Sequence, residues 1–197
     1  ALVKTSVDMV KEKLIDKNRA LTRIPAQQLE ALLHRTMDES KIKDHKQVAK
    51  GIAASPGAAS GIVVFDVKKT IELGEAGKKI ILVRKETKPE DVPAFFSAEG
   101  ILTSLGGKSS HAAIVSRGMG KPCIVGCPEL KIDYDNNTCT TNGITIKEGE
   151  TISINGSEGT VFIGEVPTVE PKVTKDFEQI LEWAQKTKTL GIRANAD

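Results

Sequence analysis

The sequence predicts an α+β fold with a β-rich middle and helical ends. Apolar residues recur at helical spacing over 1–33, whereas short β-branched runs bounded by glycine, proline or charge dominate from Gly51 onward. Near the chain's end, one helical face again gathers four apolar residues, Phe177, Ile180, Leu181 and Ala184. Because 39% of the 197 residues are hydrophobic, we expect one main core with sizeable extensions.

The first 33 residues are predicted to form three short helices. Asp16 can cap the second, because its carboxylate can accept from the first-turn N–H groups. Pro25 can open the third, because proline lacks an N–H that a first turn would leave unpaired. Residues 35–50 are polar and charged, and they are predicted as a linker.

Short strands follow in the middle of the chain. Buried strands are predicted at 61–65, 78–85, 100–104 and 121–126, with a short helix over 88–99 between the second and third. Glycine turns then divide residues 140–165 into apolar runs, which predicts a β-meander.

Composition excludes several classes of function. Lys and Arg number 28 against 26 Asp and Glu, and no basic run is interleaved with aromatic residues, so no nucleic-acid partner is expected. No apolar stretch approaches a membrane span, so no membrane partner is expected either. The three cysteines have neither disulfide-framework nor zinc-site spacing, and they predict structural thiols, no metal site, and a reducing compartment, cytoplasmic or organellar.

The stretch "LGGKSSHAAIVSRGMGKP", residues 105–122, is the strongest motif in the chain. Its "GKS" follows a predicted strand and precedes a helical run, as a nucleotide-binding P-loop does. That motif also requires a glycine at position 102, where the sequence has Leu102, so the triphosphate-wrapping loop is not predicted.

A phosphorylated histidine suits the same stretch better. If Ser110 is the N-cap, His111 lies in the first turn of a helix that Gly118 or Gly120 ends. A neutral imidazole is nucleophilic, and the helix dipole can stabilise a phosphoryl group bound to it. The preceding residues would supply open backbone, one charge and two hydroxyl groups to bind the phosphate: Gly106, Gly107, Lys108, Ser109 and Ser110.

Other interpretations of the histidines remain open from chemistry alone. A histidine at a helix start is often a capping or solvated residue, and a loop of this kind can also bind phosphate without a covalent bond. His34 and His45 lack a glycine-rich cradle and are predicted to be surface or packing residues. Arg117 lies roughly 240° around the helix from His111, and it is predicted as a helix-end or interdomain residue.

Residues 100–126, "GILTSLGGKSSHAAIVSRGMGKPCIVG", resemble the phosphohistidine signature of the phosphoenolpyruvate-utilising enzyme family. The resemblance extends to "GIAASPGAASGIVVF", to "ILVRKETKPEDV", and to the helical "SVDMVKEKLI" and "QLEALLH", which favour its pyruvate phosphate dikinase branch over phosphoenolpyruvate synthase and enzyme I. One departure stands two residues before the histidine, where the family usually has a threonine and this chain has Ser109.

This resemblance implies a swivelling β/β/α phosphohistidine domain at residues 49–165. It also implies a nucleotide-region edge and linker at 1–48, and a linker helix with the first strand of a phosphoenolpyruvate/pyruvate barrel at 166–197. His111 would shuttle phosphate between an ATP site and a pyruvate site in other domains of the same enzyme, expected to be a homodimer that uses Mg²⁺. Arg193 matches a substrate-contacting arginine of that barrel. No cofactor is expected in this fragment, and it is expected to be inactive alone because it lacks the nucleotide core and most of the barrel.

Overall fold

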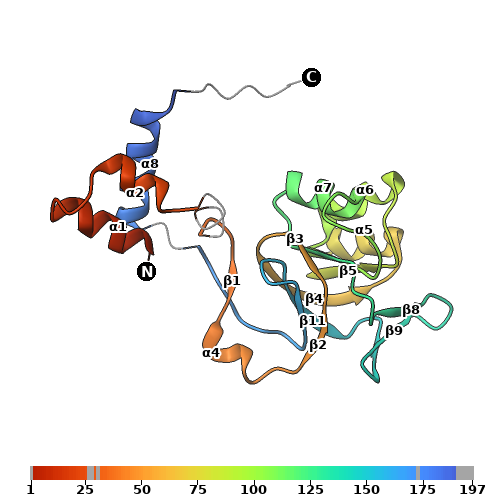
Figure 1. Cartoon of the computed structure of the whole chain (residues 1–197). Coiled ribbons are helices and arrows are strands. Elements are labelled where there is room, and N and C mark those ends of the chain that lie inside the picture. Colours follow the sequence, from red (N-terminus) through yellow and green to blue (C-terminus); the bar gives the residue numbers. More distant parts are fainter. Residues whose placement is uncertain (1, 26–28, 30–31, 172–173, 190–197) are drawn as a thin grey trace. The chain divides into compact units, whose positions relative to one another are not determined.

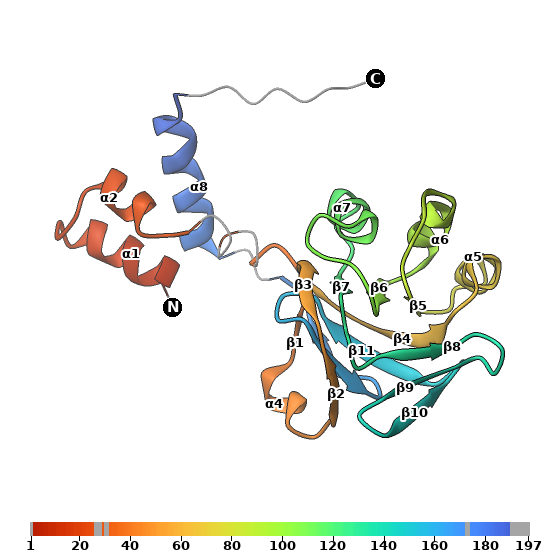
Figure 2. The same ribbon diagram turned by 45° about the vertical axis from the view of Figure 1, so that its right-hand side comes forward.

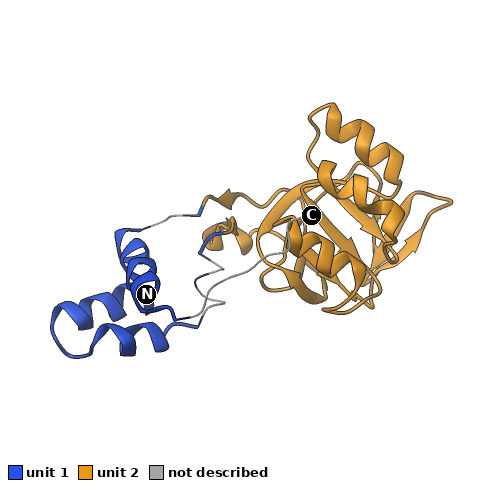
Figure 3. Ribbon diagram, turned by 90° about the horizontal axis from the view of Figure 1, so that it is seen from above, with its two compact units in different colours: residues 1–33, 171–197 blue, residues 34–170 orange. Residues whose placement is uncertain are grey.

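The computed structural model describes residues 2–25, 29, 32–171 and 174–189. The chain divides into two compact units, one formed by residues 1–33 with 171–197 and the other by 34–170 (Figure 3). The fold class is α+β, as predicted.

The first unit is helical and has its own small core. It contains α1 (Leu2–Lys11), α2 (Lys17–Thr22) and α8 (Lys175–Thr187). The carboxylate of Asp16 accepts from the backbone N–H of Arg19 at 2.7 Å, which confirms the predicted cap. The helices pack around a shared apolar cluster of Val7, Ala20, Ile24, Ile180 and Trp183.

Two predictions for this unit need comment. Leu181, assigned to the buried face of the last helix, is 46% exposed, while Trp183 is buried in its place. Phe177, Ile180 and Trp183 follow one another at three-residue spacing on the buried face of α8, and the ammonium of Lys17 lies 5.8 Å from the ring centroid of Trp183. The third predicted helix falls mostly outside the described residues.

An eight-stranded sheet forms the centre of the second unit, in the order β2-β12-β11-β4-β5-β6-β7-β3 (Figures 1 and 2). Strands β4 to β7 are mutually parallel, and the other pairings are antiparallel. The strands are β2 (Gln47–Lys50), β3 (Ile52–Ser55), β4 (Ala58–Val64), β5 (Ile80–Arg84), β6 (Gly100–Thr103), β7 (Cys123–Val125), β11 (Thr151–Asn155) and β12 (Thr160–Ile163).

Each face of this sheet is covered by a different layer. Helices α5 (Val67–Glu75), α6 (Val92–Ser97), which follows the single turn η1 (Pro89–Asp91), and α7 (His111–Gly118) lie on one face. A three-stranded sheet of β8 (Lys131–Asp133), β9 (Thr138–Thr141) and β10 (Ile144–Lys147) packs against the other. The central strands alternate accordingly, since Ile81 and Val83 join one core cluster while Leu82 joins the other.

The polar segment 35–50 is not a free linker, which corrects the prediction. It forms β1 (Thr36–Met37), the short helix α4 (Glu39–Ile42) and β2. Strand β1 pairs with β13 (Thr168–Val169), and β2 pairs with β12. Met37 is buried in a cluster with Phe162 and Val166, and Val48 in a cluster with Val161; each of these three lies more than 100 residues away, which no local pattern reveals. The compact unit therefore extends beyond the predicted limits of 49 and 165.

Candidate functional site

The predicted phosphohistidine stretch, residues 105–122, connects β6 to β7 and contains α7. Ser110 has an extended backbone conformation, and its hydroxyl accepts a hydrogen bond from the backbone N–H of Ala113 at 3.5 Å. Ser110 is therefore the N-cap and His111 the first helical residue, as predicted from the sequence. Gly118 is the last helical residue, and Gly120, with a φ of +65°, terminates the helix: its N–H donates to the carbonyl of Arg117 at 3.2 Å.

The loop before His111 has an open backbone. Gly106 has a φ of +110°, and a Cβ there would lie 3.0 Å from the Ser110 hydroxyl oxygen. Gly107 has no heavy atom of another part of the chain within 4 Å of the position that a Cβ would take. Lys108 and Ser109 are exposed. The loop thus leaves room for a ligand beside the start of α7.

The imidazole of His111 is oriented from one side. Its Nδ1 shares a hydrogen bond with the Thr87 hydroxyl at 3.3 Å, and the ring of Phe95 meets it edge-on, with centroids 6.3 Å apart. Within the described part of the chain, Nε2 has no hydrogen-bond partner. The Thr87 hydroxyl can donate to Nδ1 or accept from it; in the tautomer with the proton on Nδ1, donated to Thr87, the Nε2 lone pair is free.

Sequence reasoning missed Thr87 and did not predict the contacts of Arg117. Thr87 comes from the loop after β5, 24 residues before the histidine, and its spacing gives no sign of the contact. Arg117 does lie at the helix end, as predicted, but its guanidinium donates to the carbonyl of Ala54 at 2.8 Å and to that of Lys108 at 3.4 Å. Arg117 therefore ties α7 to β3 and to the histidine loop.

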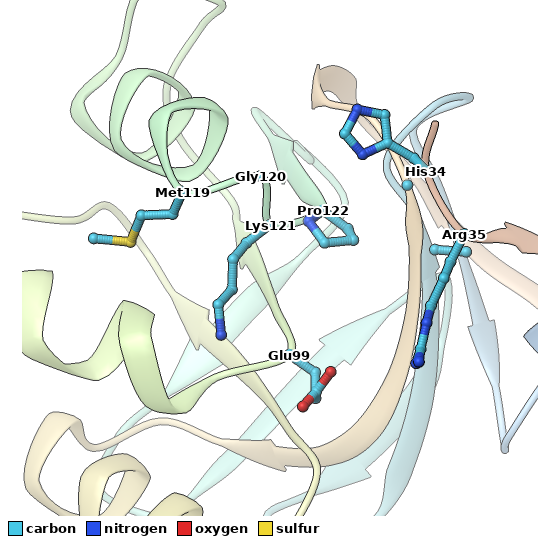
Figure 4. A pocket seen from close by; sticks show the side chains of 9 residues that line it. His34, Arg35, Glu99, Met119, Gly120, Lys121 and Pro122 are labelled. Carbon is cyan, nitrogen blue, oxygen red and sulfur yellow. The ribbon is translucent and has the colours of Figure 1, made fainter. Parts of the chain in front are cut away.

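A second polar hollow lies at the other end of α7 (Figure 4). Its volume is about 340 Å³, and its lining includes His34, Arg35, Glu99 and Lys121. The ammonium of Lys121 donates to the carbonyl of Phe96 at 2.9 Å and to that of Ala98. Burial lowers the pKa of Lys121, and the nearby Glu99 carboxylate opposes that shift.

The three cysteines and Arg193 are the other residues singled out from the sequence. Burial raises the pKa of the Cys123 thiol to about 11 and those of Cys127 and Cys139 to about 12, so all three stay protonated near neutral pH. Arg193 lies outside the described residues. In the described ranges, no three His, Cys, Asp or Glu side chains gather where a metal ion could bind. No helix among those same residues is long and apolar enough to cross a bilayer.

Comparisons with known proteins agree with the phosphohistidine resemblance. Residues 76–159 match the family described as "PEP-utilising enzyme, mobile domain". The chain is 48% identical over its whole length to "Pyruvate, phosphate dikinase" of Entamoeba histolytica, and 42% identical over 99% of its length to the protein of that name from Rhizobium meliloti. It spans 22% of the length of each.

A third relative is "Pyruvate, phosphate dikinase 1, chloroplastic" of Arabidopsis thaliana, 45% identical over 99% of the chain and 20% of that protein. An NMR solution structure of Enzyme I aligns with 55% of this chain and 37% of that one, at 20% identity and a TM-score of 0.33. On the sequence matches, the chain belongs to the phosphoenolpyruvate-utilising enzymes and contains their mobile domain.

Proposed function

We propose that this chain is a phosphoryl carrier in which Nε2 of His111 accepts a phosphoryl group and later gives it up. The observation that supports this most strongly is the imidazole itself, with Nδ1 held by Thr87 and Nε2 unpartnered among the described residues. It stands at the first position of α7, beside a loop with room for an anion.

The chemistry follows from these groups. The Nε2 lone pair attacks the phosphorus of a donor phosphate, the P–O bond to the leaving group breaks, and the leaving oxygen takes the electron pair. The Nδ1 proton, donated to Thr87, stabilises the positive charge that develops on the ring. The phosphoryl oxygens face the N-terminal end of α7, with Lys108 and Ser109 free to donate to them. In the second transfer an oxygen of the acceptor bonds to phosphorus, the P–N bond breaks, and its electron pair returns to Nε2.

The full enzyme that we propose is a phosphotransferase of the pyruvate, phosphate dikinase type. The names of the relatives support this, as does the chain's share of about 22% of their length, which leaves room for separate nucleotide and barrel domains. Mg²⁺ and a homodimeric state are assigned to that full enzyme, and Arg193 to its barrel. The steps above use only this chain's own groups. The chloroplastic relative is compatible with an organellar or cytoplasmic compartment.

The decisive experiment is an intact-mass measurement of the chain incubated with ATP or phosphoenolpyruvate. Alone, the chain should gain no phosphate, because the transfer requires the cradle and metal ions of the other domains. With a separate nucleotide or barrel domain added, it should gain one phosphoryl group that is labile in acid and stable in base. Labelling by ATP without any added domain would overturn the carrier proposal, and phosphate held only non-covalently would favour a binding module instead.

A further inference from the structure

The loop that presents Thr87 to His111 is fixed at both of its ends. We call residues 85–88, between β5 and η1, the threonine loop. At its far end, the backbone N–H of Lys88 donates to the carboxylate of Asp91 at 2.9 Å. At its near end, the carbonyl of Lys85 accepts from the backbone N–H of Leu105 at 2.8 Å, which joins the threonine loop to the histidine loop. Thr87 lies between these two anchors.

The third anchor comes from the opposite layer of the fold. Tyr134, in the turn between β8 and β9, accepts the backbone N–H of Lys85 on its hydroxyl at 2.9 Å. Its ring lies 5.3 Å from the guanidinium carbon of Arg84 and meets Phe65 edge-on, with centroids 6.5 Å apart. The side chain is 43% exposed, so burial of the ring does not account for its placement. Its specific contact is the one to Lys85.

Arg84 packs against the ring of Tyr134 and is itself held by two contacts. One guanidinium nitrogen donates to the carbonyl of Phe65 at 2.9 Å, and the other lies 3.8 Å from the carboxylate of Asp91. The group under Tyr134 is therefore itself fixed at two points. The ring of Tyr134 has a rigid surface to rest on, so its hydroxyl can hold Lys85 in one place.

Given the phosphoryl-carrier function proposed above, we infer that Tyr134 is a positioning residue for His111. By holding Lys85, its hydroxyl fixes the threonine loop so that Thr87 accepts the Nδ1 proton of His111 and Nε2 is left as the nucleophile. The three-stranded sheet thus acts on a histidine that lies on the opposite side of the central sheet. Neither Tyr134 nor Lys85 contacts the reacting atoms.

The physical basis is the weakness of the Thr87 contact itself. At 3.3 Å between Oγ1 and Nδ1, it lies near the long end of a hydrogen bond, so a small shift of the threonine loop breaks it. Once Nδ1 loses its partner, the two neutral tautomers come closer in energy and the ring can turn. A single neutral hydrogen bond lost at Lys85 predicts a fall of about 2- to 10-fold in reactivity at Nε2.

The test uses Tyr134→Phe, which keeps the ring and its contacts with Arg84 and Phe65 and removes only the hydroxyl. Thr140→Val is the matched control, because it removes a hydroxyl from the same small sheet, one that faces Thr145 at 3.4 Å. Three quantities are measured on the whole chain: the ¹⁵N signals of the His111 ring, the exchange rate of the Lys85 amide, and the rate and site of phosphorylation by phosphoramidate. In that reaction Nε2 bonds to phosphorus, the P–N bond of the reagent breaks, and ammonia leaves.

In Tyr134→Phe we expect faster Lys85 exchange, loss of the single tautomer in the ¹⁵N spectrum, a 2- to 10-fold slower reaction at Nε2 and more product at Nδ1. Thr140→Val should match the unaltered chain in all three. An unchanged tautomer and rate in Tyr134→Phe would refute the inference, and so would equal changes in the two variants. If the unaltered chain took no phosphate, the proposed function would fail, while the tautomer signal would still decide the role of Tyr134.

Discussion

The two ends of helix α7 carry different kinds of polar group. At the N-terminal end, His111 presents a ring nitrogen without a partner among the described residues, next to a loop that leaves open space. At the C-terminal end lies the hollow of about 340 Å³, whose lining includes His34, Arg35 and Lys121. There, however, Lys121 donates to two backbone carbonyls and Arg35 pairs with Glu170.

The polar groups at the two ends of α7 therefore differ in what they can do chemically. The cations at the C-terminal end of α7 already have partners, because Lys121 donates to two carbonyls and Arg35 pairs with Glu170, so they are not free to bind a phosphoryl group. The imidazole at the N-terminal end faces the positive end and keeps a free lone pair, so it can react. The hollow at the C-terminal end of α7 is therefore the weaker candidate for phosphoryl transfer.

The largest expected effect separates two histidines at opposite ends of α7. In the complete set of domains, His111→Asn should abolish phosphoryl labelling, because asparagine retains polarity but lacks the nucleophilic lone pair. His34→Asn should label as fully as the unaltered chain. Intact mass gives the labelled fraction, and circular dichroism checks folding. A stable phosphoramidate on His111→Asn would show that another residue accepts the phosphate.

A smaller loss is expected when the space beside His111 is filled. Gly106 has a positive φ and Gly107 does not, so Gly107→Val adds bulk in open space without the strain of a left-handed backbone. A misplaced phosphate should slow labelling on the order of 100-fold. Gly118→Val, in equally open space at the other end of α7, is the control and should label normally. Equal losses in thermal stability and labelling for Gly107→Val would instead assign this glycine to folding.

Removal of the N-cap should affect stability more than chemistry. Ser110→Ala should lower the free energy of unfolding by about 1 kcal/mol, because the Ala113 N–H loses its partner. Ser109→Ala should leave that free energy unchanged, because Ser109 is exposed. Urea unfolding of both variants measures the difference. The cap assignment fails if the two substitutions destabilise the chain equally.

The smallest effect concerns pH at the C-terminal end of α7. Burial lowers the pKa of Lys121 in the folded chain below its ordinary 10.5. Between the lowered pKa of the folded chain and 10.5, the unfolded chain binds more protons than the folded chain does. The contribution of Lys121 to stability therefore rises with pH in this range. Relative to Lys121→Met, the unaltered chain should therefore gain stability from pH 8 to pH 10, as urea unfolding would show. The buried thiols act with the opposite sign above pH 9, but they do so equally in both proteins. A constant difference would mean that Lys121 is solvated like a surface lysine.

Local patterns in the sequence were enough to predict much of the fold. The β-branched runs predicted the central strands, and the Ser110 cap with its following apolar run predicted α7 to within a residue. These features depend on neighbours only a few residues apart, whose hydrogen-bonding and packing preferences are written in the sequence itself. The choice of His111 as the candidate nucleophile rested on the same local chemistry.

The tertiary structure alone decided which distant groups meet. Strands β1 and β2 lie in a polar stretch of the sequence. They form because β13 and β12 supply their hydrogen-bonding partners. The helix α5 was also not predicted, because glycine and charge interrupt its short apolar pattern.

The contacts around the histidine are of the same non-local kind. Thr87 reaches His111 and Tyr134 reaches Lys85 across separations of 24 and 49 residues. Such contacts are fixed by how the sheet and its two covering layers pack, and side-chain spacing along one element carries no record of them. The sequence was enough to propose His111 as the reactive residue, and the packing of the layers decided which groups lie against its imidazole.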